Sequence, residues 1–342
     1  WAGLRRSLAA VALGMGLAGL PLALTLGFLP ETVRGAGFAP DVGLGNAVHP
    51  AVLLQTVLPN LFGLPQAPAE AWWGGRFFSK GLPYFLSLYL GPVALALAVL
   101  GFGAMARTHR FVLLVLGGVG LWYALGEAGG LATVVARLPL AASFRFPGKA
   151  MLLPHLAVAV AAAFGCERLR GDRRAWRRLA AIAGGWAALA LGVALLLRTA
   201  PPRLVAWTGV APDFWPHVVG VVTRDAAVAV TLGVASAALA LVVRRGWLGP
   251  GGATAALVAL SLADLARAGA GVNPQAPASF FAPLPEMESL ELAAPDGERV
   301  FSYGLQESPG FRGFLALGGG GLTLAGTYLN RQILAPYTNI LD

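Results

Sequence analysis

Long apolar stretches, separated by short polar segments, make up most of residues 1–270. Several approach the about 20 predominantly apolar residues that a helix needs to cross a hydrocarbon core about 30 Å thick. A helix satisfies its own backbone hydrogen bonds without water, so it is the expected form of each crossing. The pattern predicts seven membrane spans, at residues 7–29, 82–104, 111–125, 148–166, 179–197, 226–243 and 252–270.

The composition supports a membrane protein. Of the 342 residues, 57% are hydrophobic and only 12% are charged, whereas about 25% are charged in ordinary soluble domains. An ordinary soluble enzyme is therefore excluded. We expect an all-α polytopic membrane protein with about seven transmembrane helices, in which residues 1–270 form the transmembrane domain.

Arginine in the short loops predicts the orientation of these spans. Four short segments carry pairs or runs of arginine, at residues 5–6, 107–110, 168–178 and 244–245. Short basic loops face the cytoplasm, and seven alternating crossings place all four segments on that side. The long loop 30–81, the loop with "SFRFPGK", the loop 198–225 and the tail then face outward.

The formal net charge of +9 raises the question of an anionic partner. The densest basic run, "ERLRGDRRAWRR" at residues 167–178, adjoins membrane helices and has little aromatic interleaving. We therefore expect it to contact anionic lipid headgroups at the cytoplasmic face rather than nucleic acid. The chain has one cysteine, Cys166, and four scattered histidines without metal-ligand spacing, so we expect no metal site and no cofactor.

The outward loop 30–81 is apolar but interrupted by proline. Its segment "HPAVLLQTVLPNLFGLP", residues 49–65, is too short between prolines to span, which predicts a short helix in the membrane interface. The aromatic segment "AWWGGRFFSKGLPYFLSLYLG" follows. It is either an aromatic belt at the membrane surface or a groove with Arg76 and Lys80 at its mouth, open to a lipid-borne phosphate or a sugar.

The stretch "SFRFPGK" places two cations between apolar segments. Pro147 disfavours helix at Phe146 and suits the first position of the next helix, so Arg145 is expected in the loop and Lys149 in the first helical turn. The two cations and the helix N-terminus could together bind an anion such as phosphate. The alternative is that both side chains extend to lipid headgroups, as cations near helix ends commonly do.

Two acidic residues also need an explanation. Glu127 follows the third span and faces outward, where it could serve as a base, as an acceptor for a sugar hydroxyl or as a counterion; the alternative is a structural ion pair with Arg137 or Arg145. Asp264 lies within the seventh span, where an acid needs a partner. Arg267, three residues later, is at ion-pair spacing.

The tail, residues 271–342, differs from the rest of the chain. A proline-rich connector leads through an acidic stretch to "RVFSYG", a short strand pattern. The run "LGGGGLTLAG" lacks the Lys-Ser/Thr of a nucleotide-binding loop. We expect a small outward-facing α/β piece. The chain opens on Trp and stops at "NILD", so we expect a fragment that lacks N-terminal spans and is truncated at its C-terminus.

Several segments in this order resemble the bacterial YfhO-like membrane protein family: "HP…LLQTVLPNLFGLP", "PYFLSLYLG", "LPLAASFRFPGKAMLL", "SLADLARAGAGVNP" and "GERVFSY". The resemblance implies a GT-C-type glycosyltransferase in the bacterial plasma membrane, with its C-terminal region outside the cytoplasm. Such an enzyme takes a sugar from a polyprenyl-phosphate donor on the outer face and passes it to a cell-envelope glycopolymer.

The resemblance also implies roles for residues. Arg145 and Lys149 would hold the donor phosphate and stabilise the negative charge that develops on it. Enzymes of this architecture usually carry a carboxylate base in the first outward loop of the whole chain, which we expect to lie upstream of this one. Asp41 matches no motif, so the base is unassigned. The alternative function is a non-enzymatic transporter of a lipid or anionic polymer; the lack of an internal repeat favours the transferase.

Overall fold

The computed structural model describes residues 2–32, 34–35, 37–63, 72–78, 84–138, 141–270 and 272. All regular secondary structure in these residues is helical. The α-helices are α1 (Ala2–Phe28), α2 (Pro40–Gly43), α3 (Pro92–Ala104), α4 (Arg107–Ala124), α5 (Leu131–Val135), α6 (Leu152–Gly171), α7 (Arg173–Arg198), α8 (Pro202–Thr208), α9 (Trp215–Arg244) and α10 (Pro250–Gly269). The short 3-10 helices are η1 (Leu29–Glu31), η2 (Pro50–Thr56), η4 (Gly74–Arg76), η6 (Ala141–Ser143), η7 (Pro147–Met151) and η8 (Pro212–Phe214).

Five described helical segments are long and apolar enough to cross a membrane. They coincide with five of the seven predicted spans and cover Leu8–Glu31, Pro147–Gly171, Arg173–Arg198, Pro212–Arg244 and Pro250–Gly269. An all-helical architecture, with five helical segments long and apolar enough to cross a membrane, is therefore confirmed for the described part of the chain.

The other two predicted spans are not long apolar helices. The span predicted at 82–104 is helical only from Pro92, and its 13 residues cover about 20 Å at 1.5 Å each. Gly91 adopts a left-handed conformation, with φ of 82°, and Pro92 has no backbone N–H, so the helix does not continue backward through them. In α4, the first turn carries Arg107 and Arg110, which leaves an apolar part shorter than a full crossing.

A short helix is present in the segment 49–65, as the 3-10 helix η2. Most of the large apolar side chains of η2 and of the turns after it are buried: Val52 is 1% exposed and Phe62 is 1% exposed, whereas Leu54 is exposed. Pro50 begins η2 and Pro59 lies in the turns after it, so the segment forms no long helix. The position of this segment in the membrane interface stays a prediction. The tail beyond residue 270 lies outside the described residues except for Val272.

The described chain divides into two compact units. The first consists of described residues in Trp1–Leu53, Phe77–Phe85 and Met105–Ala161; the second consists of those in Leu54–Arg76, Leu86–Ala104 and from Ala162 onward. The two units were not predicted from the sequence, and both include parts of loop 30–81.

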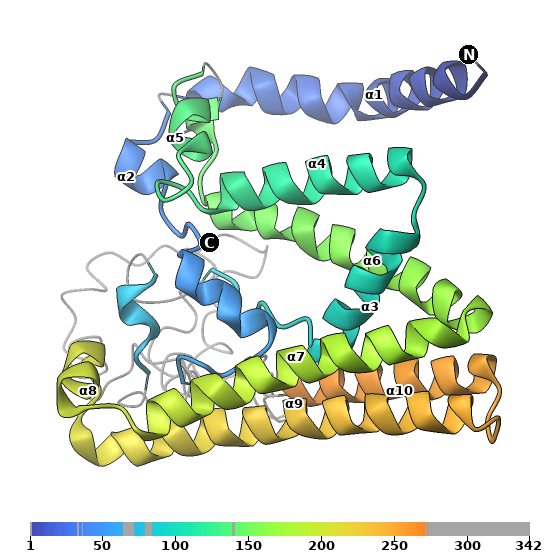
Figure 1. Cartoon of the computed structure of the whole chain (residues 1–342). Coiled ribbons are helices and arrows are strands. Elements are labelled where there is room, and N and C mark those ends of the chain that lie inside the picture. Colours follow the sequence, from blue (N-terminus) through green and yellow to red (C-terminus); the bar gives the residue numbers. More distant parts are fainter. Residues whose placement is uncertain are drawn as a thin grey trace, which may run out of the picture. The chain divides into compact units, whose positions relative to one another are not determined.

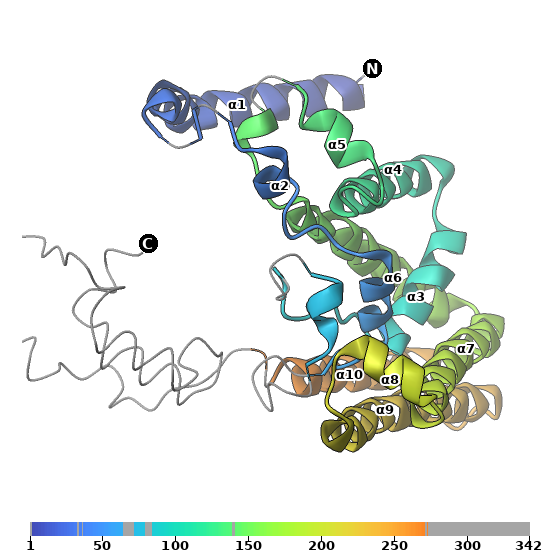
Figure 2. The same cartoon turned by 90° about the vertical axis from the view of Figure 1, so that its left-hand side faces the viewer.

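In the first unit, α4 packs against the start of the segment that continues into α6 (Figure 2). Glycines allow the close approach: a Cβ at Gly117 would lie 3.1 Å from the Cβ of Ala157, and one at Gly120 would lie 2.6 Å from the Cβ of Leu153. The large apolar side chains of α1, by contrast, are exposed. Such exposure is expected of a helix in contact with lipid.

The second unit is built around α7 and α9, which run side by side with α10 next to α9 (Figures 1 and 2). Small residues form the contact between α7 and α9: a Cβ at Gly233 would lie 3.2 Å from the Cβ of Ala187. Trp176 is fully buried in the core of this unit, and its Nε1 donates a hydrogen bond of 3.1 Å to the carbonyl oxygen of Leu169. The core includes side chains of α9 and α10, the helices that carry Asp225, Asp264 and Arg267.

Candidate functional site

Two distant segments of the first unit are hydrogen-bonded to each other at the "SFRFPGK" stretch. The backbone N–H of Phe38 donates to the carbonyl oxygen of Ala142 at 2.8 Å. The hydroxyl of Ser143 donates to the carbonyl oxygen of Arg34 at 2.9 Å. The part of loop 30–81 near residue 34 thus lies directly beside the segment that precedes Arg145.

Phe146 is the aromatic centre of this region. The guanidinium carbon of Arg145 lies 4.6 Å from the centre of the Phe146 ring, and Nζ of Lys149 lies 5.4 Å from it. Both distances suit cation–π contacts. Pro147 begins η7, so Arg145 is in the loop and Lys149 in the first helical turn, as predicted. Both cationic side chains are exposed.

The backbone of Phe146 is strained. It adopts φ of 69° and ψ of 75° in the left-handed region, where a residue with a Cβ costs about 1–2 kcal/mol. Its N–H donates to the carbonyl oxygen of Gly43 at 3.1 Å, and its own carbonyl oxygen accepts from the N–H of Lys149 at 3.1 Å. These two hydrogen bonds hold the backbone of Phe146 in the strained conformation. The Phe146 ring therefore stays near both Arg145 and Lys149.

Two further aromatic rings and a third cation join the cluster. Tyr84 lies with its ring centre 5.4 Å from that of Phe146 and 5.2 Å from Nζ of Lys149. The guanidinium carbon of Arg145 is 5.4 Å from the ring centre of Phe38, and that of Arg34 is 5.7 Å from the same centre. Arg34 and Phe38 could not be assigned to this cluster from the sequence, because no motif marks their part of the loop. We call the whole set the cation–aromatic cluster: Arg34, Phe38, Tyr84, Arg145, Phe146 and Lys149.

No described carboxylate neutralises this cluster. Within the described residues, Arg34, Arg145 and Lys149 form no ion pair. Glu127 is exposed in the turn after α4 and pairs with neither Arg137 nor Arg145. The structural ion pair considered for Glu127 is therefore wrong, and three cations are left facing solvent without an acidic partner among the described side chains.

The other sequence-predicted cations lie elsewhere. Arg76 belongs to the second unit, where its guanidinium carbon lies 5.3 Å from the ring centre of Trp207 in α8. Lys80 and the side chain of Asp41 lie outside the described residues. The structure therefore groups Arg145 with Lys149 but does not describe a groove formed by Arg76 and Lys80.

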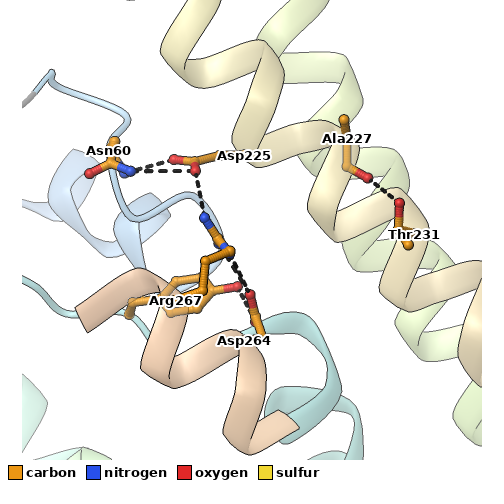
Figure 3. Close-up of polar contacts among 7 residues, drawn as sticks. Asn60, Asp225, Ala227, Thr231, Asp264 and Arg267 are labelled. Atoms are coloured by element: carbon orange, nitrogen blue, oxygen red, sulfur yellow. Dashed lines mark hydrogen bonds and ion pairs between the residues drawn. The ribbon is translucent and has the colours of Figure 1, made fainter. Parts of the chain in front are cut away.

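A second polar cluster lies in the second unit, where the predicted pairing of Asp264 with Arg267 is confirmed. Nη2 of Arg267 lies 3.1 Å from Oδ1 of Asp264. The same guanidinium reaches Asp225 of α9, with Nη1 3.5 Å from Oδ1 (Figure 3). Arg267 thus bridges carboxylates from two helices. The contact with Asp225 could not be predicted from sequence pattern, because Asp225 is 42 residues from Arg267 along the chain.

Each of these carboxylates also holds a segment outside the long helices. Asp225 accepts hydrogen bonds from the backbone N–H of Asn60 at 3.0 Å and from its side-chain amide at 3.4 Å (Figure 3). Asp264 accepts one from the hydroxyl of Tyr89 at 2.5 Å. We call these five residues the carboxylate network: Asn60, Tyr89, Asp225, Asp264 and Arg267.

Tyr89 serves this network as a neutral donor. It lies outside the five long apolar helices. Burial, reinforced by the hydrogen bond to Asp264, raises the pKa of the Tyr89 hydroxyl above its ordinary value, so the hydroxyl keeps its proton. Gly91 lets this segment pass close to the acid: a Cβ there would lie 3.0 Å from Oδ2 of Asp264. The hydrogen bonds of the network connect the segments of Asn60 and Tyr89 to Asp225 within α9 and to Asp264 near the C-terminus of α10.

Metal binding finds no support in the described part of the chain, because no three His, Cys, Asp or Glu side chains gather there. Comparison of the chain with protein-family models, with curated proteins and with solved structures gives no match. The chemistry of the two clusters therefore carries the functional argument.

Proposed function

We propose that the protein is a membrane glycosyltransferase of the GT-C type, similar to the YfhO-like family, that transfers a sugar from a polyprenyl-phosphate donor to a cell-envelope glycopolymer. One observation carries the proposal: Arg145 and Lys149 are exposed over the same Phe146 ring, and no described carboxylate pairs with them. Cations that gather over one ring and lack an acidic partner suit an anionic ligand such as a lipid phosphate.

The proposed topology has seven crossings and puts this cluster on the outer face. The two short helices, Pro92–Ala104 and Arg107–Ala124, follow one another in the chain. If both helices cross the membrane, or if neither does, the chain returns to the same side before α6. The direction of every later helix is then the same in the two cases. The outward position of "SFRFPGK" therefore does not depend on whether the count is five or seven, and the basic run near Arg173 stays on the cytoplasmic side, next to anionic lipids.

The proposed reaction needs the cations at the departing phosphate. The oxygen of an acceptor hydroxyl forms a bond to the anomeric carbon, and the bond from that carbon to the phosphate oxygen breaks. Its electron pair stays on the phosphate, which changes from a diester with one negative charge to a monoester, and the hydroxyl proton passes to water. Arg145 and Lys149 would stabilise the added charge on the leaving phosphate.

A second candidate is a transporter of a lipid or anionic polymer, with the same cations guiding the cargo. The observation that favours it is the lack of a described carboxylate at the cation–aromatic cluster, since transport needs no base. Both candidates place the protein in a bacterial plasma membrane, with the tail outside the cytoplasm. They differ in whether the sugar changes its covalent partner.

The test is transfer in proteoliposomes. Wild type is supplied with labelled polyprenyl-phosphate hexoses and an envelope glycopolymer, and labelled polymer is counted. The double variant Arg145→Ala/Lys149→Ala should lose at least about 100-fold in turnover, the scale seen on removing a group that stabilises transition-state charge. Arg137→Ala is the matched control, because Arg137 is an exposed arginine of the same unit outside the cluster.

Two results would count against the transferase. If the double variant kept wild-type turnover, the alternative would be favoured, in which Arg145 and Lys149 contact lipid headgroups and do not bind the donor phosphate. Movement of the intact labelled donor across the bilayer by wild type, without labelled polymer, would favour the transporter. Intact membrane insertion of the double variant, checked by protease accessibility of the loops, keeps either result interpretable.

A further inference from the structure

Arg34 is the cation of the cluster to which no role has been given. Its guanidinium carbon lies 5.7 Å from the ring centre of Phe38, and that of Arg145 lies 5.4 Å from the same point. The two charges are therefore no more than about 11 Å apart. By the same reasoning from the Phe146 ring, Arg145 and Lys149 are no more than about 10 Å apart.

The backbone fixes Arg34 in this position. Its carbonyl oxygen accepts the hydroxyl hydrogen bond of Ser143, two residues before Arg145. Gly37 turns the chain between Arg34 and Phe38 with a positive φ of 77°, and a Cβ there would lie only 3.1 Å from that of Ala142. The arginine is therefore held beside the "SFRFPGK" stretch by main-chain geometry and not by its side chain alone.

Charge is not compensated around Arg34 either. Glu31, the acid nearest to it in the chain, is exposed and forms no ion pair within the described residues. The Debye length is about 8 Å at physiological salt, and Arg34 and Lys149 lie no more than about 11 Å and about 10 Å from Arg145. The charges of Arg34 and Lys149 are therefore only partly screened at a phosphate that is bound by Arg145.

We infer that Arg34 makes the cation–aromatic cluster selective for a lipid-borne phosphomonoester over a phosphodiester, an inference that rests on the proposed lipid-phosphate site. A monoester carries about −1.5 to −2 charge at pH 7, with a second pKa near 6, whereas a diester carries one negative charge. Two cations already exceed the charge of a diester. The third cation matches the form in which the phosphate leaves the transfer reaction.

The experiment is isothermal titration calorimetry of the full chain in a non-ionic detergent at pH 8. The probes are farnesyl phosphate, a monoester, and farnesyl methyl phosphate, a diester of nearly the same shape. Wild type should bind the monoester about tenfold more tightly, which corresponds to about 1.4 kcal/mol. Arg34→Ala should reduce this ratio to about twofold by weakening the monoester while leaving the diester nearly unchanged.

Matched variants separate the possible outcomes. Arg137→Ala should keep the wild-type ratio, and Arg34→Gln, which keeps the length of the side chain, should behave as Arg34→Ala if charge is the cause. If both Arg34 variants kept the wild-type ratio of monoester to diester affinity, the role inferred for Arg34 would be refuted, but the proposed phosphate site would not. Unchanged binding of both probes by Arg145→Ala/Lys149→Ala would instead overturn the proposed phosphate site itself.

A free anion is the other source of this chemistry. Inorganic phosphate is titrated in competition with farnesyl phosphate, and it should displace the lipid only at concentrations at least about 100-fold higher. Displacement at equal concentrations would show a site for soluble phosphate and would refute the lipid-borne ligand. Thermal unfolding of every variant, compared with wild type, shows whether a loss of binding reflects a loss of folding.

Discussion

Loss of the Arg267 charge should destabilise the second unit more than the loss of any exposed arginine. The side chains of Asp225 and Asp264 are only 2% and 5% exposed, whereas that of Arg267 is 36% exposed. Arg267→Gln would leave two buried carboxylates without their shared cation. Removing one partner of a buried ion pair typically costs 3–5 kcal/mol, and because water reaches Arg267 we expect the lower end, about 3 kcal/mol.

Neutralising Asp225 and Asp264 as well should restore most of the free energy of unfolding that Arg267→Gln loses. In Asp225→Asn/Asp264→Asn/Arg267→Gln, the side-chain amides can still accept the hydrogen bonds of Asn60 and Tyr89, and no buried charge is left unpaired. The triple variant should therefore be only about 1 kcal/mol less stable than wild type. Such non-additivity is the signature of groups that act as one network.

Unfolding free energies in bicelles, measured by steric trapping, test this expectation. Arg224→Gln is the matched control, since Arg224 is exposed, adjoins Asp225 and forms no ion pair in the described part of the chain. The reasoning is refuted if Arg267→Gln and Arg224→Gln differ by less than about 0.5 kcal/mol, or if the triple variant is as unstable as Arg267→Gln.

Two further substitutions probe the backbone at the two clusters. Gly91→Ala should cost about 1–2 kcal/mol more than Gly209→Ala, because both glycines have φ near 80° but only the first would place a Cβ against Asp264; equal losses by steric trapping would show that the contact is loose. Phe146→Gly should keep or raise stability by about 1 kcal/mol, since glycine adopts positive φ without strain. It should nevertheless weaken farnesyl phosphate binding at least about threefold by calorimetry, because the ring no longer fixes the cations; wild-type affinity would show that the ring has no such role.

The parts of the fold that could be predicted from sequence are those set by local pattern. Continuous apolar length is a local property, and it located the helices that include Leu179 and Val243. It failed at 82–104, where the run is apolar but Gly91 and Pro92 start the helix late. Apolar length also does not distinguish residues buried in protein from residues that face lipid, because both kinds have the same composition. Phe62, in the turns after η2, is buried in the protein at 1% exposure.

The same division applies to the clusters. Pro147 locally separates Arg145 from Lys149, and the spacing from Asp264 to Arg267 is one helical turn, so both arrangements could be predicted. The remaining partners are far apart in the chain. Asn60 and Asp225 are separated by 165 residues, and no periodicity within one segment indicates which distant segment will contact it. Their contacts follow from how the elements pack, which sequence pattern alone does not fix.

The contrast between the clusters is the strongest reason to assign ligand binding to the cations. A charge buried without a partner costs several kcal/mol, so Asp225 and Asp264 must be paired for the second unit to fold, and both are. An exposed charge costs little to leave without a counterion, so folding does not require an acid beside Arg145 or Lys149. Yet these side chains are held over a ring whose residue, Phe146, occupies an unfavourable backbone conformation. Strain of this kind persists where surrounding structure enforces a particular geometry, and here that geometry holds positive charge, unopposed by any described carboxylate, as the proposed anion site requires.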